Sequence, residues 1–62
     1  MRQILEAALD TGDISAFDGV IDGAAYVRIL RMQQYARDGV LLAADAWKVA
    51  LIDAVAAVDG GA

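Results

Sequence analysis

Residues 40–59, VLLAADAWKVALIDAVAAVD, form the longest segment of this chain in which the apolar pattern has only one reading. Along it, six apolar positions follow one another at alternating steps of four and three: Val40, Ala44, Trp47, Leu51, Ala54 and Val58. This alternation is the seam of a helix that packs lengthwise against another helix. The segment therefore predicts a helix over residues 40–59.

The same segment is apolar well beyond its seam. Its central charges, Asp45, Lys48 and Asp53, occupy one arc of the helix, and apolar residues lie among them. A surface helix of a small monomer has one apolar face, whereas a helix that is apolar nearly all round must be covered from two sides. We therefore expect the six seam residues to form the interface of a homodimer or higher oligomer.

A membrane span is the main rival reading of this helix. Twenty helical residues rise about 30 Å, which matches the hydrocarbon core of a bilayer. However, each of the three central charges would cost roughly 2.5 to 3.5 kcal/mol on insertion scales. The N-terminus, MRQILEAALDTGD, also lacks the basic and apolar regions of a signal peptide. We therefore expect no membrane partner and a cytoplasmic location.

The size of the chain favours assembly as well. Sixty-two residues form a single domain, residues 1–62, and a chain of this length buries only about 60% of the surface that its unfolded form exposes. The sequence has no cysteine and no histidine, so disulfides and the usual zinc sites cannot stabilise it. Oligomerisation is the remaining common remedy.

The first third of the chain shows two shorter helical patterns. Residues 2–10 predict a helix that ends at Thr11 and Gly12, and a helix this short must dock or fray. We expect Asp13 to cap a second helix over residues 13–22. Near Gly23 two alternatives stay open: a turn between two helices, or one bent helix over residues 13–38.

The middle of the chain predicts a longer helix over residues 24–38, with Gly39 in the left-handed position that follows a helix. A connection this short favours an antiparallel hairpin with the helix over residues 40–59. The predicted fold class is therefore all-α: a short bundle of three to four helices, completed by oligomerisation, with a flexible tail at residues 60–62.

Charge is distributed unevenly along the chain. Residues 1–23 carry a net charge of −4, residues 24–39 carry +2, and the remainder carries −2. An acidic segment beside a basic helix suits self-complementary packing. We therefore expect Arg28 and Arg31 to meet Asp18 or Asp22, either within one chain or across a subunit boundary.

The basic residues of the middle helix also admit a second function. Arg28, Arg31 and Arg37, interleaved with tyrosines, suit contact with nucleic acid. If the chain turns at Gly23, residues 13–38 have the outline of a helix-turn-helix with the basic helix second. The alternative prediction is thus a small dimeric nucleic-acid-binding regulator, although the acidic residues before Gly23 oppose phosphate.

No motif of this sequence carries catalytic chemistry. Asp10, Thr11 and Gly12 match the core triplet of aspartic proteases, but they close a predicted helix. The aspartates do not have the spacing of a calcium-binding loop, and no phosphate-binding loop or Ser/His/Asp set is present. We expect no catalytic, cofactor or metal site, and a non-enzymatic protein that binds another protein or forms a structural oligomer.

Overall fold

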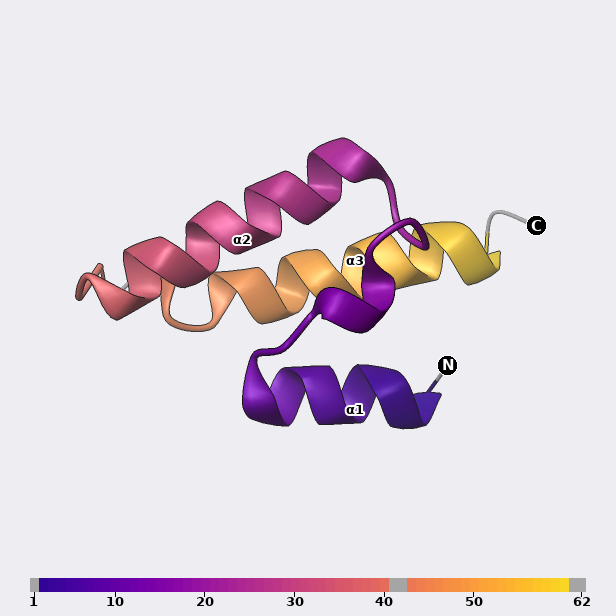
Figure 1. The fold of residues 1–62 in the computed structure, drawn as a ribbon, viewed down its shortest axis with the longest axis horizontal. Coiled ribbons are helices and arrows are strands. Elements are labelled where there is room, and N and C mark those ends of the chain that lie inside the picture. Colours follow the sequence, from indigo (N-terminus) through magenta and orange to yellow (C-terminus); the bar gives the residue numbers. More distant parts are fainter. Residues whose placement is uncertain (1, 41–42, 61–62) are drawn as a thin grey trace.

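The computed structural model describes residues 2–40 and 43–60. They form three α-helices and one short 3-10 turn: α1 (Arg2–Thr11), η1 (Ser15–Phe17), α2 (Gly23–Arg37) and α3 (Ala46–Gly60) (Figure 1). This part of the chain contains no strand, which confirms the all-α prediction.

Helix α2 begins and ends one residue earlier than the predicted helix over residues 24–38, and Gly39 follows it in the left-handed position as predicted. The Asp22 carboxylate accepts a hydrogen bond of 3.2 Å from the Ala25 N–H and so caps the first turn. At the other end Gly39 has a φ of +91°, and the N–H groups of Gly39 and Val40 donate to the carbonyls of Ala36 and Tyr35. This is a Schellman motif. Because α2 starts at Gly23 with Asp22 as its cap, residues 13–38 are not one bent helix, and the break near Gly23 is the alternative observed.

The predicted helix over residues 13–22 is wrong, because only the three residues of η1 are helical there. The Asp13 carboxylate accepts from the Ser15 N–H at 3.0 Å, a bond of the kind that starts a helical turn, but the turn ends after three residues. Asp18 then has an extended backbone, and Gly19 has a φ of +80°. The segment thus turns back on itself, which brings Ile14, Phe17 and Ile21 into the core.

The last helix also starts later than predicted. Residues 44 and 45 form a turn, and α3 begins at Ala46 instead of Val40; Leu41 and Leu42 lie outside the described residues. The Ala43 side chain is buried in this connection, and its N–H donates to the Val40 carbonyl. At residues 40 and 43–45 the predicted helical seam is therefore not formed as an α-helix. Helix α3 continues through Gly60, the first residue of the predicted tail.

The two long helices pack side by side and run in opposite directions, as an antiparallel hairpin (Figure 1). Helix α1 lies across from α3, and the segment that contains η1 connects it to α2. No described helix is long and apolar enough to cross a membrane.

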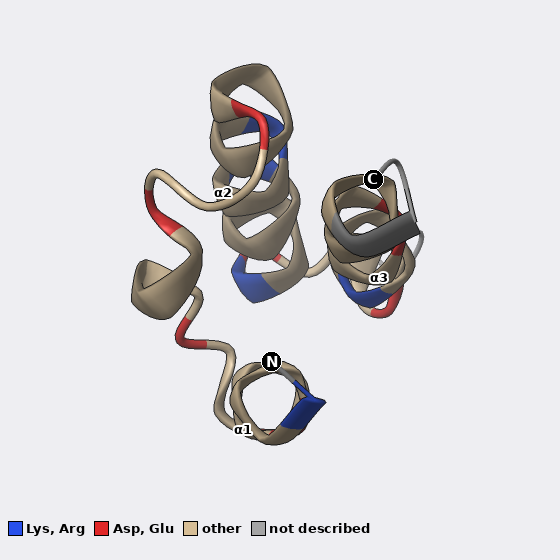
Figure 2. Ribbon diagram, turned by 90° about the vertical axis from the view of Figure 1, so that its right-hand side faces the viewer, with Lys and Arg blue, Asp and Glu red and all other residues tan. Residues whose placement is uncertain are grey.

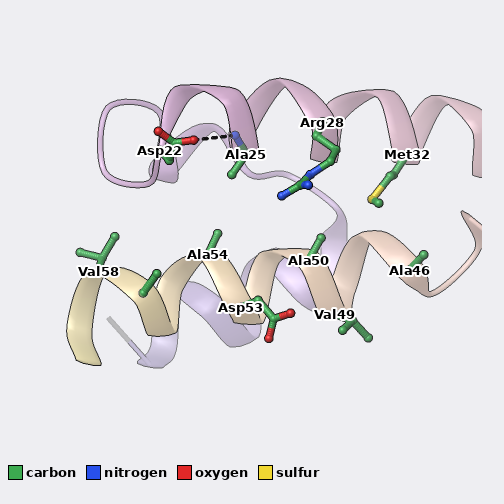
Figure 3. Close-up of a pocket in the computed structure, with 11 residues that line it drawn as sticks. Asp22, Ala25, Arg28, Met32, Ala46, Val49, Ala50, Asp53, Ala54 and Val58 are labelled. Carbon is green, nitrogen blue, oxygen red and sulfur yellow. Dashed lines mark hydrogen bonds between the residues drawn. The ribbon is translucent and has the colours of Figure 1, made fainter. Parts of the chain in front are cut away.

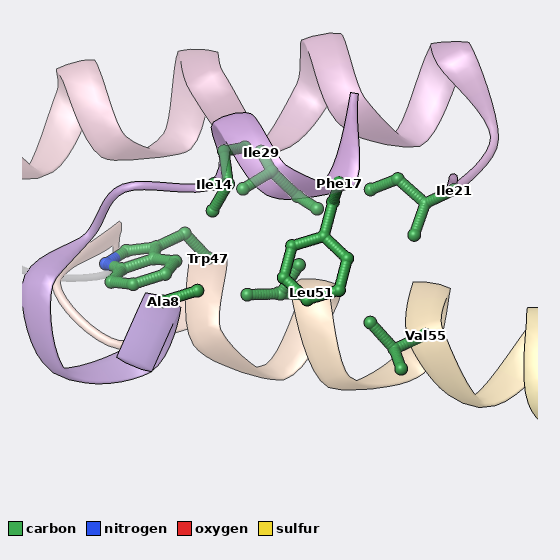
Figure 4. Close-up of a cluster of buried hydrophobic side chains, with 8 residues drawn as sticks. All are labelled: Ala8, Ile14, Phe17, Ile21, Ile29, Trp47, Leu51 and Val55. Atoms are coloured by element: carbon green, nitrogen blue, oxygen red, sulfur yellow. The ribbon is translucent and has the colours of Figure 1, made fainter. Parts of the chain in front are cut away.

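The core lies where η1 meets the hairpin (Figure 4). Phe17, Ile29 and Leu51 are its largest fully buried side chains, one from η1 and one from each long helix. Ala8 attaches α1 to this cluster, and the remaining members are Ile14, Ile21, Trp47 and Val55. Because η1 and α1 cover only one side of the hairpin, no described element covers the other side of α2 and α3 (Figure 2).

Candidate functional site

The candidate site is the side of the hairpin that faces away from α1 and η1. Viewed nearly along the helices, α1 and the connecting segment lie on one side of the α2–α3 pair, and no described element lies on the other (Figure 2). We call this second side the open face. It is built by α2 and α3 together, so its geometry depends on how the two helices pack.

A groove of about 640 Å³ runs along the open face between the two helices (Figure 3). Most of its lining is apolar, and much of that is alanine, which lets another surface approach the backbone closely. The apolar lining residues are Ala25, Met32, Ala46, Val49, Ala50, Ala54, Ala57 and Val58. Such a groove offers shape and apolar area but few polar anchors.

Three charged residues also line the groove: Asp22, Arg28 and Asp53. Figure 3 shows Arg28 extending from α2 towards α3, and Asp53 lies on α3 at nearly the same position along the helix axes. Asp22 is occupied by its hydrogen bond to the Ala25 N–H. Arg28 and Asp53 form no ion pair with each other, since the only ion pair between described residues joins Lys48 to Asp45 at 3.4 Å.

That observation corrects one prediction. Within one chain, neither Arg28 nor Arg31 meets Asp18 or Asp22. The physical reason is that residues 13–22 do not form a helix beside α2, so Asp18 lies on a turn instead of on a facing helix. A contact across a subunit boundary stays a prediction.

The structure places the six predicted interface residues in different surroundings. Trp47 and Leu51 are buried within the chain, at 7% and 0% exposure. Val40 and Ala44 are exposed in the connection before α3, whereas Ala54 and Val58 line the groove. The buried stripe of α3 is instead Trp47, Leu51 and Val55, at steps of four. An intersubunit role for the exposed members stays a prediction.

Several groove residues are not among those predicted from the sequence, including Ala46, Ala50 and Met32. One signal could have identified part of the set, because Ala46, Ala50 and Ala54 recur at every fourth position and so share one side of a helix.

The arginines of α2 are divided between two regions. Arg28 and Arg31 line a shallow hollow together with Met32 and Tyr35. Arg37 lies elsewhere, in a hollow with Thr11, Gly12, Gln33 and Trp47 at the end of α1. The three arginines therefore do not form one basic surface. The predicted helix-turn-helix outline is wrong for the same reason as the helix over residues 13–22.

Groups suited to catalysis or metal binding are not concentrated at the groove. Among the described residues no polar or charged side chain is buried, and no cluster of three or more acidic ligands is present. Asp13 lies away from the groove, and hydrogen bonds from Ser15 hold the pKa of its carboxyl below its usual value. These bonds lower the pKa because they stabilise the charged form.

Apolar exposure, by contrast, is abundant. Val49, in the first turn of α3, is 60% exposed, and Ile52 is 45% exposed three positions later. Other large apolar side chains that are at least 40% exposed are Ile4, Val20, Val27, Leu30, Tyr35, Val40 and Val58. Of these residues, Val49 and Val58 also line the groove, and exposed apolar surface that is contiguous in this way is typical of proteins that bind other proteins.

Comparisons with protein-family models, with curated proteins and with solved structures find no match to this chain.

Proposed function

We propose that this chain is a non-enzymatic helical module that acts by binding a protein surface at its open face. The observation that carries the proposal is the apolar groove between α2 and α3, on the side that neither α1 nor η1 covers. Covering such a surface removes apolar area from water, which favours association by roughly 25 cal/mol per Å² before the costs of ordering.

Helix α3 supplies most of this surface. It buries Trp47, Leu51 and Val55 on one side, yet it presents Ala46, Val49 and Ala50 to the groove. A helix of a self-sufficient monomer would carry polar residues at the second set of positions. The second apolar side of α3 is therefore surplus to the fold and available for a partner.

Site-specific photo-crosslinking in cells that express the protein tests the proposal. A photoreactive amino acid replaces Val49, which lines the groove, and in a matched control it replaces Gln34, which is exposed on α2 and does not line the groove. We expect adducts with protein from position 49 and few from position 34. No adduct at position 49, or equal yields at both positions, would contradict the proposal.

A nucleic-acid-binding regulator is the second candidate. It is supported by the hollow that Arg28 and Arg31 share, and by the lack of an ion pair to either residue in the described part of the chain. Against it stand the net charge of −4 and the separation of Arg37 from the other two arginines. A regulator should bind generic duplex DNA at low salt and weaken steeply as salt rises. Binding that is absent at low salt excludes this candidate.

A further inference from the structure

We infer that the partner of the open face is a second copy of this chain, in a two-fold dimer in which α2 of each copy packs on α3 of the other. This inference rests on the proposed function, because it names the occupant of the same groove. Its basis is the placement of two opposite charges, Arg28 on α2 and Asp53 on α3.

Both residues lie in the groove, and neither has an ion-pair partner among the described residues of its own chain. Figure 3 shows Arg28 and Asp53 at nearly the same position along the helix axes. Ala25 and Ala54 lie on one side of them along the groove, and Met32 and Ala46 lie on the other. The charges therefore mark the middle of the open face, and apolar residues flank them along both helices.

Two-fold symmetry allows two ways of laying one open face on another. If the axis runs parallel to the helices, α2 of one copy lies over α3 of the other, and Arg28 meets the partner's Asp53 twice. If the axis lies in the interface but crosses the helices, Arg28 meets Arg28 and Asp53 meets Asp53. Because like charges in contact are unfavourable, the charges select the first arrangement.

The selected arrangement also agrees with the packing of the helices. Within each chain α2 and α3 are antiparallel, and an axis parallel to them makes each contact between α2 and the partner's α3 antiparallel too. The result is a four-helix bundle of two stacked helix pairs, in which Ala46, Ala50 and Ala54 face the partner's α2. Alanine at these positions allows a short distance between helix axes.

This interface is not the seam that the sequence predicts. Trp47 and Leu51 stay in the core of each chain, so the dimer forms without unfolding either copy. Of the six seam residues, only Ala54 and Val58 line the groove.

Charge reversal tests the inference by sedimentation of the full chain. The variants are Arg28→Asp and Asp53→Arg, both at exposed positions on helices. Circular dichroism serves to check that each variant folds. We expect wild type to dimerise at micromolar concentration and each variant alone to dimerise about tenfold more weakly or worse, because each symmetric dimer then holds two like-charged contacts. In an equimolar mixture both contacts join opposite charges again, so heterodimers should form with affinity close to that of wild type.

Three results would overturn the inference: a monomeric wild type at these concentrations, a mixture that stays monomeric, or variants that dimerise as well as wild type. The double variant in one chain is informative as well. If it dimerises but the mixture does not, the two charges act within one chain and the intermolecular pairing is refuted. A monomeric wild type that still forms adducts with a different protein from position 49 removes the dimer and leaves the proposed function standing. Loss of all adducts at position 49 removes the proposed function itself.

Discussion

The side-chain amide of Gln33 donates a hydrogen bond of 2.7 Å from Nε2 to the carbonyl oxygen of Gly12, 21 residues earlier in the chain. This bond joins the end of α1 to the middle of α2, and Gln33 and Gly12 are both partly buried. Gly12 has a φ of +82°, so its carbonyl leaves the helix in a direction that α1 alone does not dictate. The contact fixes where the first helix sits on the hairpin.

Replacing Gln33 by glutamate should loosen α1, because a carboxylate cannot donate to the Gly12 carbonyl at neutral pH. We expect the free energy of unfolding to fall by about 1 to 3 kcal/mol, the usual cost of a lost partner. Amide hydrogen exchange should show the loss mainly in residues 2–11. The matched control is Gln34→Glu, at the exposed neighbouring position, which should leave exchange in α1 nearly unchanged. Equal effects of the two changes would refute a specific role for Gln33.

Replacing Leu51 by alanine should remove most of the stability of the fold. Leu51 is fully buried among residues of all parts of the core, and such truncations cost about 2 to 5 kcal/mol. A domain of this size has a free energy of unfolding of only roughly 3 to 9 kcal/mol. Ile52→Ala, one residue later at an exposed position, should cost about 0.5 kcal/mol or less. Urea unfolding of both variants measures the contrast, which disappears if α3 does not pack with this face inward.

Replacing Gly39 by alanine should destabilise the turn after α2 by about 1 to 2 kcal/mol, through backbone strain alone. Its φ is +91°, and a Cβ added there would meet nothing within 4 Å. Gly23 is the control, since it is helical and its added Cβ also meets nothing. Gly23→Ala should be neutral or stabilise slightly. Thermal unfolding temperatures that move the same way in both variants would contradict this assignment.

Replacing Asp22 by alanine should cost about 0.5 to 2 kcal/mol, because the Ala25 N–H loses its cap. Asp22→Asn keeps an acceptor oxygen and should retain most of the stability. Asp18→Ala changes net charge by the same amount at an exposed turn position and serves as the control for charge. The helix content of α2, followed by NMR chemical shifts, should fall only in the first of these variants.

The lowered pKa of Asp13 predicts a pH dependence of stability. A carboxyl whose pKa is lower in the folded state stabilises the fold at pH values above its unfolded-state pKa, which is about 4 for aspartate. This contribution is lost as pH falls through the lower, folded-state pKa. The variant Asp13→Asn does not titrate, so the difference in unfolding free energy between wild type and variant should narrow as the solution is acidified from neutral pH. A difference that stays constant with pH would contradict the Ser15 contacts.

Much of the secondary structure could be predicted from the sequence, because its determinants are local. The end of α1 at Thr11 and Gly12, the start of α2 at Gly23 and the left-handed Gly39 follow from capping chemistry and from the freedom of glycine. The surplus of apolar residues in α3 was also evident, since it depends on composition and helical spacing alone.

Only the tertiary structure decided which apolar residues became core and which became surface. The apolar pattern of residues 13–22 suits a helix, but the chain turns at Asp18 and Gly19, and this turn buries Ile14, Phe17 and Ile21 together. Likewise, both sides of α3 are apolar enough to be buried, so periodicity could not choose between them. The choice was made when η1 and α1 packed on Trp47, Leu51 and Val55, which left Arg28, Asp53 and the alanines between them on the open face.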